Sequence, residues 1–205
     1  MQRPEACQTD AVREPVVRVS RVADVRIGSG FLTAAEAGRW QRLVQDADRR
    51  AYLAAHVLVR QAAAELLGLP AGDADRLELE QSCPTCGAVD HGRPRIGGRP
   101  ELHVSLSHVR GVVAAIAAER PCGIDVETYA AGDVPAEMLT ARERRWAAAE
   151  PEAGAAAIRL WTRKEAWVKA SGESLERAAE LDALDAAWLT GELQSDQYAA
   201  AWVVL

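Results

Sequence analysis

Two carboxylates separated by a single residue lie in an apolar stretch of this 205-residue chain. The segment Gly-Ile-Asp-Val-Glu at 123–127 has the alternation of a β-strand, so Asp125 and Glu127 should point to one face. Two carboxylates this close repel each other unless a cation lies between them, and carboxylate oxygens are ligands that suit Mg²⁺. A strand that simply ends in a polar tip would look the same, so the pair alone leaves both interpretations open.

A third acid and a lysine follow in a helical pattern nearer the C-terminus. Helical periodicity puts Glu165 on or beside the apolar stripe of Trp161 and Val168, and Lys169 comes one turn later. An exposed pair at this spacing would contribute only about 0.2–0.5 kcal/mol. Because a solvated pair needs no tryptophan beside it, the neighbours favour a functional role for this pair.

The segment Ser-Leu-Ser-His at 105–108 ends a predicted strand. Hydroxyls, a histidine and free backbone N–H groups at a strand end could hold a phosphate oxygen, which makes Ser107 and His108 candidates. A lone histidine is more commonly structural. The chain has no Gly-x-Ser-x-Gly elbow around these serines that would make either of them a nucleophile.

A Gly- and Pro-rich loop, 83–100, opens with Cys83 and Cys86 and carries His91 five residues further on. This spacing resembles half of a zinc site, but a complete site needs four ligands and no second pair follows at a suitable distance. We therefore favour a tight loop that presents Arg93, and leave metal binding by the two cysteines open.

Arginines gather in the predicted helices of the first half of the chain. Each one alone fits a solvated helix face, but as a group they could hold the phosphate of an anionic ligand. They are Arg39, Arg42, Arg49, Arg50 and Arg60.

The elements that must position these residues alternate along the chain without a long linker. A capping box of Thr33 with Glu36 starts the first helical region, and Gly68 ends it. The predicted elements are a strand in 16–28, helix in 33–68 in two pieces, a hairpin of 102–108 with 111–119, a strand at 123–127, helix in 135–172 and a last strand in 197–205.

A weak internal echo connects the two halves of the chain. Leu-Thr-Ala-x-Glu occurs at 32–36 and again at 139–143, an offset of 107 residues. Short Ala-rich matches arise by chance, but this one predicts two similar α+β halves that join near 110–122, with any site at their seam.

Bulk composition excludes several classes of protein. With 49% hydrophobic and 26% charged residues the chain is of the soluble globular type. A net charge of −6 argues against general binding to nucleic acid or anionic membranes. We expect no membrane span, no signal peptide and no disulfide scaffold from four cysteines, and hence a cytoplasmic protein.

Taken together and in this order, the motifs resemble the Sfp-type 4′-phosphopantetheinyl transferases. The resemblance runs from about Leu32 to the C-terminus and rests on Cys-Pro-Thr-Cys-Gly with His-Gly-Arg-Pro, Val-Ser-Leu-Ser-His, Gly-Ile-Asp-Val-Glu and Trp-Thr-Arg-Lys-Glu-Ala-Trp-Val-Lys. It implies an α+β fold of two pseudo-symmetric halves, an intramolecular pseudo-dimer. It also implies transfer of the 4′-phosphopantetheine arm of coenzyme A to a serine of an apo carrier protein, with release of 3′,5′-ADP.

The resemblance assigns a role to each candidate residue. Asp125, Glu127 and Glu165 would hold Mg²⁺ against the pyrophosphate, and Lys169 would stabilise or protonate the leaving phosphate. Glu165, directly or through a bound water, would take the serine proton. The residues implied in coenzyme A binding are Ser107, His108, Lys169, Arg93 in the position of a family lysine near the adenosine end, and Arg50 or its neighbour Arg49 at the 3′-phosphate.

The expected organisation is a flexible arm at 1–15, an N-terminal half at 16–110 and a C-terminal half at 111–205, acting together as a monomer. The implied partners are coenzyme A and apo acyl or peptidyl carrier proteins of polyketide, nonribosomal-peptide or fatty-acid synthesis. Two alternatives stay open at this point. One is a non-catalytic carrier-binding or zinc-stabilised interaction module, and the other is a Mg²⁺-dependent nucleotide pyrophosphatase.

Overall fold

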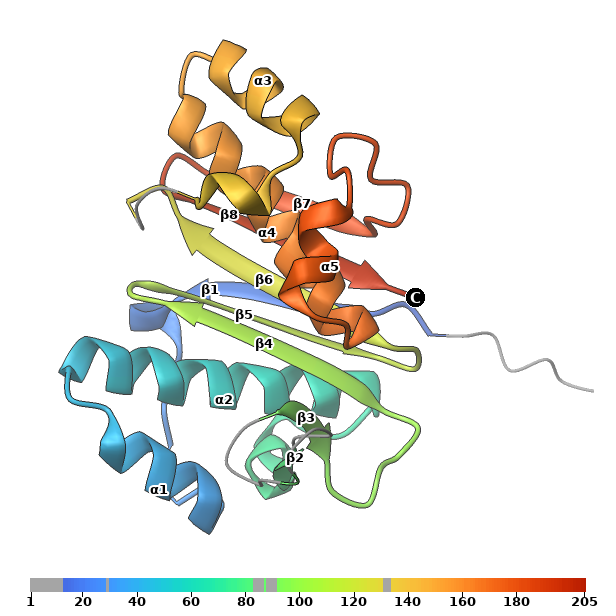
Figure 1. Cartoon of the computed structure of the whole chain (residues 1–205). Helices are drawn as coiled ribbons and strands as arrows, with labels where there is room; N and C mark the ends of the chain where they lie inside the picture. The colour runs from blue at the N-terminus through green and yellow to red at the C-terminus, as the bar shows by residue number, and fades with distance from the viewer. Residues whose placement is uncertain (1–12, 29, 83–86, 88–91, 131–133) are drawn as a thin grey trace, which may run out of the picture.

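The structure, a computed structural model, describes residues 13–28, 30–82, 87, 92–130 and 134–205 (Figure 1). Mixed helices and antiparallel sheets make it an α+β protein, as predicted. The predicted arm at 1–15 lies mostly outside the described residues, and the predicted cysteine motif at 83–86 lies wholly outside them.

The first sheet has five strands that span the N-terminal part of the chain. Its order is β1 (Val16–Arg21), β5 (Val112–Ala118), β4 (His103–Val109), β3 (Arg93–Ile96) and β2 (Leu79–Ser82), all antiparallel. Helix α2 (Asp46–Leu66) covers the face of β4 and β5, and α1 (Ala34–Arg42) precedes it. The predicted hairpin of β4 with β5 is confirmed, with Val109 opposite Val112 across the turn.

The second sheet has three strands and lies above the first in Figure 1. Its order is β6 (Cys122–Thr128), β8 (Tyr198–Val204) and β7 (Gly191–Gln194). Helix α4 (Ala153–Ser171) packs on β6 and β8, with α3 (Ala141–Ala149) and α5 (Leu175–Glu180) beside it. Short 3₁₀ helices lie at Val22–Asp24, Ala71–Arg76 and Ala136–Met138.

Strand β5 is buried along its whole length because both of its faces are covered. Ala115 and Ala117 face α2, while Ala114 and Ile116 pack with Ile124 of β6 in a second core between the sheets. This double burial explains why residues 112–118 form a continuous apolar run instead of an alternating one. The β4–β5 turn, where residues 110 and 111 were predicted to divide the halves, lies inside the first sheet. The chain changes sheet between β5 and β6.

The two Leu-Thr-Ala-x-Glu segments form the same local structure. Thr33 with Glu36 and Thr140 with Glu143 are both capping boxes, at the starts of α1 and α3. In both, the glutamate is buried and pairs with a buried cation from the following long helix. Similarity of the complete halves stays a prediction.

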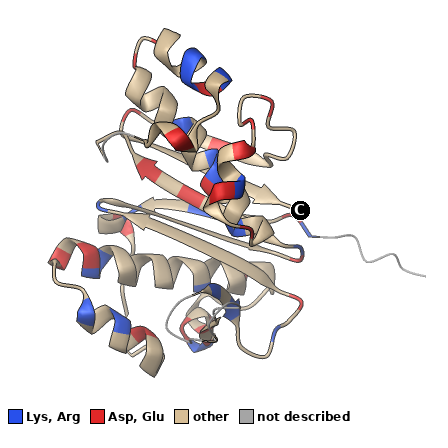
Figure 2. Cartoon of the chain, in the orientation of Figure 1, with Lys and Arg blue, Asp and Glu red and all other residues tan. Residues whose placement is uncertain are grey.

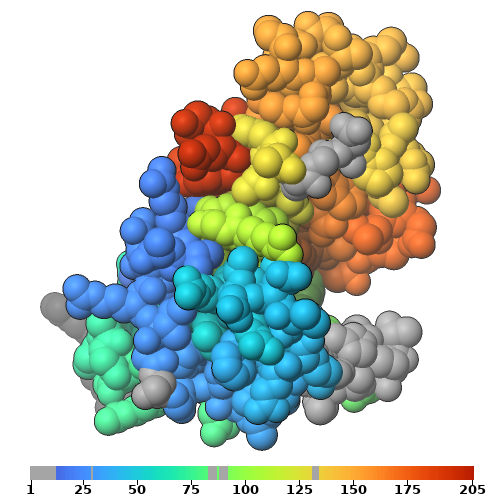
Figure 3. Space-filling model, turned by 90° about the vertical axis from the view of Figure 1, so that its left-hand side faces the viewer, coloured from blue at the N-terminus to red at the C-terminus, as the bar shows by residue number. Residues whose placement is uncertain are grey.

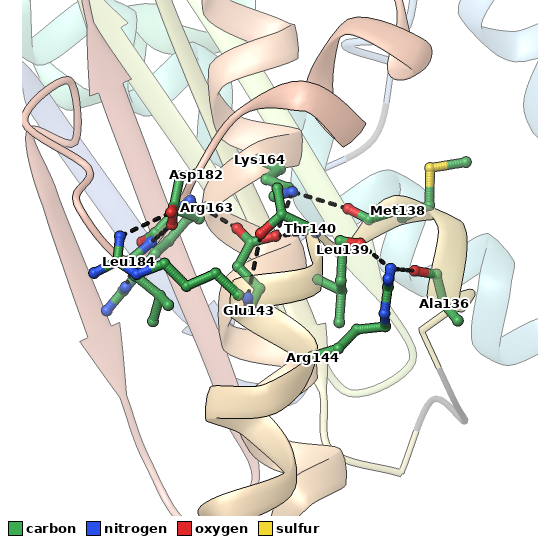
Figure 4. A network of polar contacts seen from close by, with 12 residues as sticks. Ala136, Met138, Leu139, Thr140, Glu143, Arg144, Arg163, Lys164, Asp182 and Leu184 are labelled. Carbon is green, nitrogen blue, oxygen red and sulfur yellow. Dashed lines mark hydrogen bonds and ion pairs between the residues drawn. The ribbon is translucent and has the colours of Figure 1, made fainter.

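The buried cations differ in kind. Arg60 of α2 donates to Glu36 at 2.8 Å, and Lys164 of α4 lies 2.7 Å from Glu143. Figure 4 shows the second pair, in which Lys164 also donates to the carbonyl of Met138 at 2.9 Å. A buried ion pair is tolerated only when its remaining polar atoms are hydrogen-bonded, and both pairs meet that condition.

None of the helices in the described part of the chain is long and apolar enough to cross a membrane. Acidic and basic residues are mixed over both sheets and their helices in the view of Figure 2. The acidic residues behind the net charge of −6 therefore do not form one separate acidic region in this view.

Candidate functional site

Asp125 lies where the two sheets meet, and its carboxylate joins three elements. The Ser107 hydroxyl of β4 donates to its Oδ1 at 2.8 Å, and the Lys169 ammonium of α4 donates to the same oxygen at 2.6 Å. Asp125 is only 3% exposed, and its other oxygen, Oδ2, is buried without a hydrogen-bond partner in the structure. A buried carboxylate oxygen without a partner is costly, so it marks a position that a further group could satisfy.

A glycine brings α4 close enough for this contact. A Cβ at Gly123 would lie 2.1 Å from the carbonyl oxygen of Ala166 and 2.4 Å from the backbone nitrogen of Ala170. No side chain fits there, so only glycine allows β6 and α4 to pack at this distance. The close approach carries Lys169 onto Asp125.

Ser105 makes a second hydrogen bond between β4 and β6, two residues before Ser107. Its hydroxyl accepts a hydrogen bond from the backbone N–H of Ile124 at 3.2 Å. Ser105 and Ser107 are buried on the face of β4 opposite to Val104 and Leu106, which pack toward α2. The alternation in this segment thus separates a core face from a face that contacts the second half.

The two other acids are half-buried and electrostatically coupled to Asp125. Burial, and after it the neighbouring charge of Asp125, together raise the pKa of Glu127 from 4.5 to about 7, although Lys169 opposes the shift. Burial also raises the pKa of Glu165, again with a contribution from Asp125. Both carboxylates are therefore prone to take up a proton or a cation.

Among the described residues, no three His, Cys, Asp or Glu side chains form a ready-made metal site. The Lys169 ammonium supplies the positive charge beside Asp125 instead. The donor set nevertheless suits a hard cation, because it consists of carboxylate oxygens, one of them buried and unpartnered. The predicted Mg²⁺ ligands Asp125, Glu127 and Glu165 thus fit the ion in chemistry.

His108 ends the buried part of β4 and packs against an aromatic stack. Its ring meets that of Tyr52 edge-on with centroids 6.1 Å apart, and Tyr52 stacks on His56 at 3.9 Å. Burial, and after it the nearby His56 and Lys169, together lower the pKa of His108 from 6.5 to about 4. At neutral pH the ring is uncharged, so it can meet an anion through an N–H hydrogen bond but not through a positive charge.

Arg93 reaches from the first sheet to the end of α4. Its Nη2 donates to the carbonyls of Lys169 at 2.8 Å and Ala170 at 2.5 Å. A pocket of about 530 Å³ opens beside it, between β3, β4 and the end of α4, and Lys169 and Gly172 form part of its wall. Strands of the first sheet and the helix that packs on the second sheet therefore line one cavity.

The predicted group of phosphate-binding arginines is divided by the structure. Arg60 is fully buried and bound to Glu36, so it cannot reach a ligand and is removed from the group. Arg49 donates to the carbonyl of Leu43 at 2.7 Å. Arg50 is exposed on α2, outside the contacts that join Ser107, Asp125 and Lys169.

Sequence reasoning did not identify several residues that shape this site. Gly123 was read only as part of a strand, although a glycine inside a strand commonly marks a close backbone approach. The edge-on contact of His108 with Tyr52 had no sequence signal, because it depends on how α2 packs across β4. The stacking of Tyr52 on His56 could have been predicted, since the two lie four residues apart on one helix.

Comparison with known proteins gives one match to a family model and one to a curated relative. Residues 121–203 match the model of the 4′-phosphopantetheinyl transferase superfamily. A 4′-phosphopantetheinyl transferase of Bacillus subtilis is 26% identical over 149 residues, which cover 70% of this chain. The match spans 62% of that relative's length. The superfamily match covers Asp125, Glu127, Glu165 and Lys169.

Proposed function

We propose that this protein is an Sfp-type phosphopantetheinyl transferase with two pseudo-symmetric halves. It moves the 4′-phosphopantetheine arm of coenzyme A onto a serine hydroxyl of an apo acyl or peptidyl carrier protein, and 3′,5′-ADP leaves. The observation that carries the proposal is the meeting of Asp125 with Ser107 and Lys169 at the seam, where the charge of Asp125 also helps to raise the pKa values of two further acids, Glu127 and Glu165.

The reaction exchanges one P–O bond for another. The carrier serine oxygen bonds to the phosphorus that bears the pantetheine arm, and the bond from that phosphorus to the oxygen of 3′,5′-ADP breaks. The serine proton must leave as the new bond forms, and the departing phosphate gains negative charge. In-line transfer of this kind depends on positioning and charge stabilisation more than on covalent chemistry by the protein.

Glu165 is the base that we assign to the serine proton, directly or through water. Burial raises its pKa, which makes its carboxylate a stronger base than an exposed glutamate. Lys169 provides the ammonium that stabilises or protonates the departing phosphate. The chain thus needs no activated serine of its own, since the nucleophile comes from the carrier protein.

Asp125, Glu127 and Glu165 are the residues that would hold Mg²⁺, which when bound supplies positive charge to the pyrophosphate. The buried, unpartnered Oδ2 of Asp125 is the observation that favours this assignment. Burial first, and then the like charge of Asp125, raise the pKa values of Glu127 and Glu165, and a bound cation would relieve this cost.

Coenzyme A would bind across the seam. Ser107 and neutral His108 would contact its phosphates through hydrogen bonds, and the pocket beside Arg93 would receive the adenosine end. Arg50, exposed on α2, is our assignment for the 3′-phosphate, with Arg49 as the neighbouring choice. We expect the protein to act as a cytoplasmic monomer.

Mass spectrometry of candidate apo carrier proteins tests the proposal. Each carrier is incubated with the protein, coenzyme A and Mg²⁺, and the expected result is a gain of one phosphopantetheine group on its serine. Parallel reactions with a chelator or without coenzyme A should leave the carrier unmodified. If carriers bind to the protein but gain no mass, the non-catalytic interaction module becomes the better interpretation. Nucleotide release from coenzyme A without any carrier would instead favour a pyrophosphatase.

A further inference from the structure

The C-terminal end of α4 is satisfied by a side chain from the other sheet. The last carbonyls of any α-helix lack intrahelical partners, and the helix dipole makes this end negative. In α4 the carbonyls of Lys169 and Ala170 both accept hydrogen bonds from the guanidinium of Arg93, which lies on β3 some 76 residues earlier. A cation of the first sheet therefore caps a helix of the second half.

Gly172 makes room for this contact. It is the C-cap residue with φ of 76°, a left-handed conformation that glycine adopts without strain. A Cβ there would lie 3.0 Å from Nη2 of Arg93 and 3.2 Å from its Cζ, so a side chain would crowd the guanidinium. The absence of a side chain at Gly172 therefore leaves the space that the guanidinium of Arg93 occupies.

The capped turn is also the turn that carries Lys169. Its Nζ lies 2.6 Å from Asp125, and its own carbonyl accepts from Arg93 at 2.8 Å. Lys169 thus makes both contacts: its side chain binds Asp125, and its backbone carbonyl binds Arg93. If the last turn of α4 frays, the Lys169 ammonium loses its fixed position on Asp125, and Glu165, one turn earlier, loses its C-terminal support.

We propose that Arg93 is a positioning residue that holds Lys169 on Asp125 by capping the end of α4. The expected effect on transfer rests on the proposed function, whereas the capping of α4 by Arg93 does not depend on it. Two helix carbonyls accept from Nη2 of Arg93, so the guanidinium is held against the end of α4 beside the pocket. Its charge then serves the rate of transfer more than the binding of coenzyme A.

A double-mutant cycle tests this positioning role. Carrier modification is measured for wild type, Arg93→Ala, Lys169→Met and the double variant, with kcat and the KM for coenzyme A determined separately. Arg93→Ala should lower kcat by about 10- to 100-fold, as expected for a misplaced catalytic group, while KM changes by less than about 2-fold. In the Lys169→Met background the same change should have almost no further effect on kcat, because the residue it positions is gone.

Arg95→Ala is the matched control. Arg95 lies on the same strand, and its guanidinium donates to the hydroxyl of Ser82 on β2. It should keep the wild-type kcat. Restoration of kcat in Arg93→Ala by added guanidinium ion, but no such restoration in Lys169→Met, would support the cap specifically. A rise in KM with unchanged kcat, or effects of Arg93→Ala and Lys169→Met that multiply, would overturn the proposal.

Hydrogen exchange separates failure of the cap from failure of the proposed function. If wild type modifies no carrier protein, the transferase assignment fails, but the exchange experiment still decides the structural inference. Amides at the end of α4, including that of Gly172, which donates to the carbonyl of Val168 at 2.8 Å, should exchange faster in Arg93→Ala. They should exchange as in wild type in Arg95→Ala. Equal exchange in all three proteins would refute the cap.

Discussion

At the scale of single residues, the two oxygens of Asp125 have different environments. Oδ1 accepts hydrogen bonds from Ser107 and Lys169, whereas Oδ2 is buried and unpartnered. Strand periodicity correctly predicted that Asp125 and Glu127 would share a face. The pairing of Asp125 with Lys169 could not be predicted, because it depends on the distance between β6 and α4 and not on local spacing.

Neutralising Asp125 should affect stability and transfer together. In Asp125→Asn the shape is kept, but Lys169 loses the charge that it contacts, so the free energy of unfolding should fall by about 1–3 kcal/mol. Carrier modification should fall on the order of 100-fold, because the charges around the pyrophosphate are no longer balanced. Thermal melts and mass spectrometry measure the two effects. Asp185→Asn, which removes an exposed ion-pair partner of Arg142, is the control and should change neither by much. Wild-type transfer in Asp125→Asn would remove Asp125 from the site.

At the scale of elements, the site depends on the close packing of β6 against α4. Periodicity and caps correctly predicted the order of β1, the two helices α1 and α2, the hairpin β4–β5, β6, the helical region of α3 and α4, and the last strand, β8. They missed β2, β7 and α5, and β3 (Arg93–Ile96) lies in the segment 83–100 that was predicted to be a loop. The arrangement of those elements was not, because β5 and β6 follow each other in sequence yet belong to different sheets. The apolar run 112–118 indicated a buried strand, but not which elements cover its two faces.

Glycine substitutions test the packing distance directly. Gly123→Ala puts a methyl group where backbone atoms of α4 already lie, so β6 and α4 must separate. We expect a loss of at least about 1–3 kcal/mol from overpacking, and a loss of transfer as Lys169 moves away from Asp125. Gly154→Ala, in an open position near the start of α4, is the matched control and should be neutral or stabilising by about 0.5–1 kcal/mol. Denaturant unfolding of both variants measures the contrast; similar stability for the two would mean that the interface can adjust.

At the scale of the whole molecule, the two sheets share a core and should behave as one unit. Ile116 and Ala114 of β5 pack with Ile124 and Val126 of β6, and all four are fully buried. In the space-filling view of Figure 3, the yellow-green segment around residue 110 lies between the blue and cyan N-terminal part and the orange and red C-terminal part. A local loss of stability in the first half should therefore reach the second half.

The buried network of α1 and α2 makes that coupling testable by pH. Burial raises the pKa of Glu36, but hydrogen bonds from His56 and Arg60 outweigh it and lower the value from 4.5 to about 2. Burial lowers the pKa of His56 below its ordinary 6.5. A lowered pKa in either group gives stability that is present above the unfolded value and is lost as pH falls toward the folded one. The stabilising contributions of both groups are therefore present at pH 7. That of His56 is lost as pH falls below about 6.5, and that of Glu36 is lost between about pH 4.5 and 2.

Other buried groups titrate in the same range, so the comparison must be between variants. The raised pKa values of Glu127 and Glu165 act in the opposite direction, since the fold takes up protons there as pH falls, whereas His108 acts in the same direction as His56. Subtracting the melting temperature of Glu36→Gln from that of wild type at each pH leaves the contribution of the Glu36 network alone. The difference should be largest at pH 7 and should shrink steadily as pH falls from 4.5 toward 2.

The readout of this experiment also decides whether the molecule is one cooperative unit. Five of the six tryptophans, at 146, 161, 167, 188 and 202, lie in the second half, so fluorescence reports mainly on that half, whereas circular dichroism reports on both. If the shared core couples the sheets, the two signals should give the same melting temperature in wild type and in Glu36→Gln, although the substitution lies in the first half. Glu65→Gln, at an exposed partner of Arg18, should leave the pH profile unchanged. Should the fluorescence transition of Glu36→Gln stay at the wild-type temperature while the dichroism transition moves down, the halves unfold independently, and a site built from both would have to be assembled by its ligands.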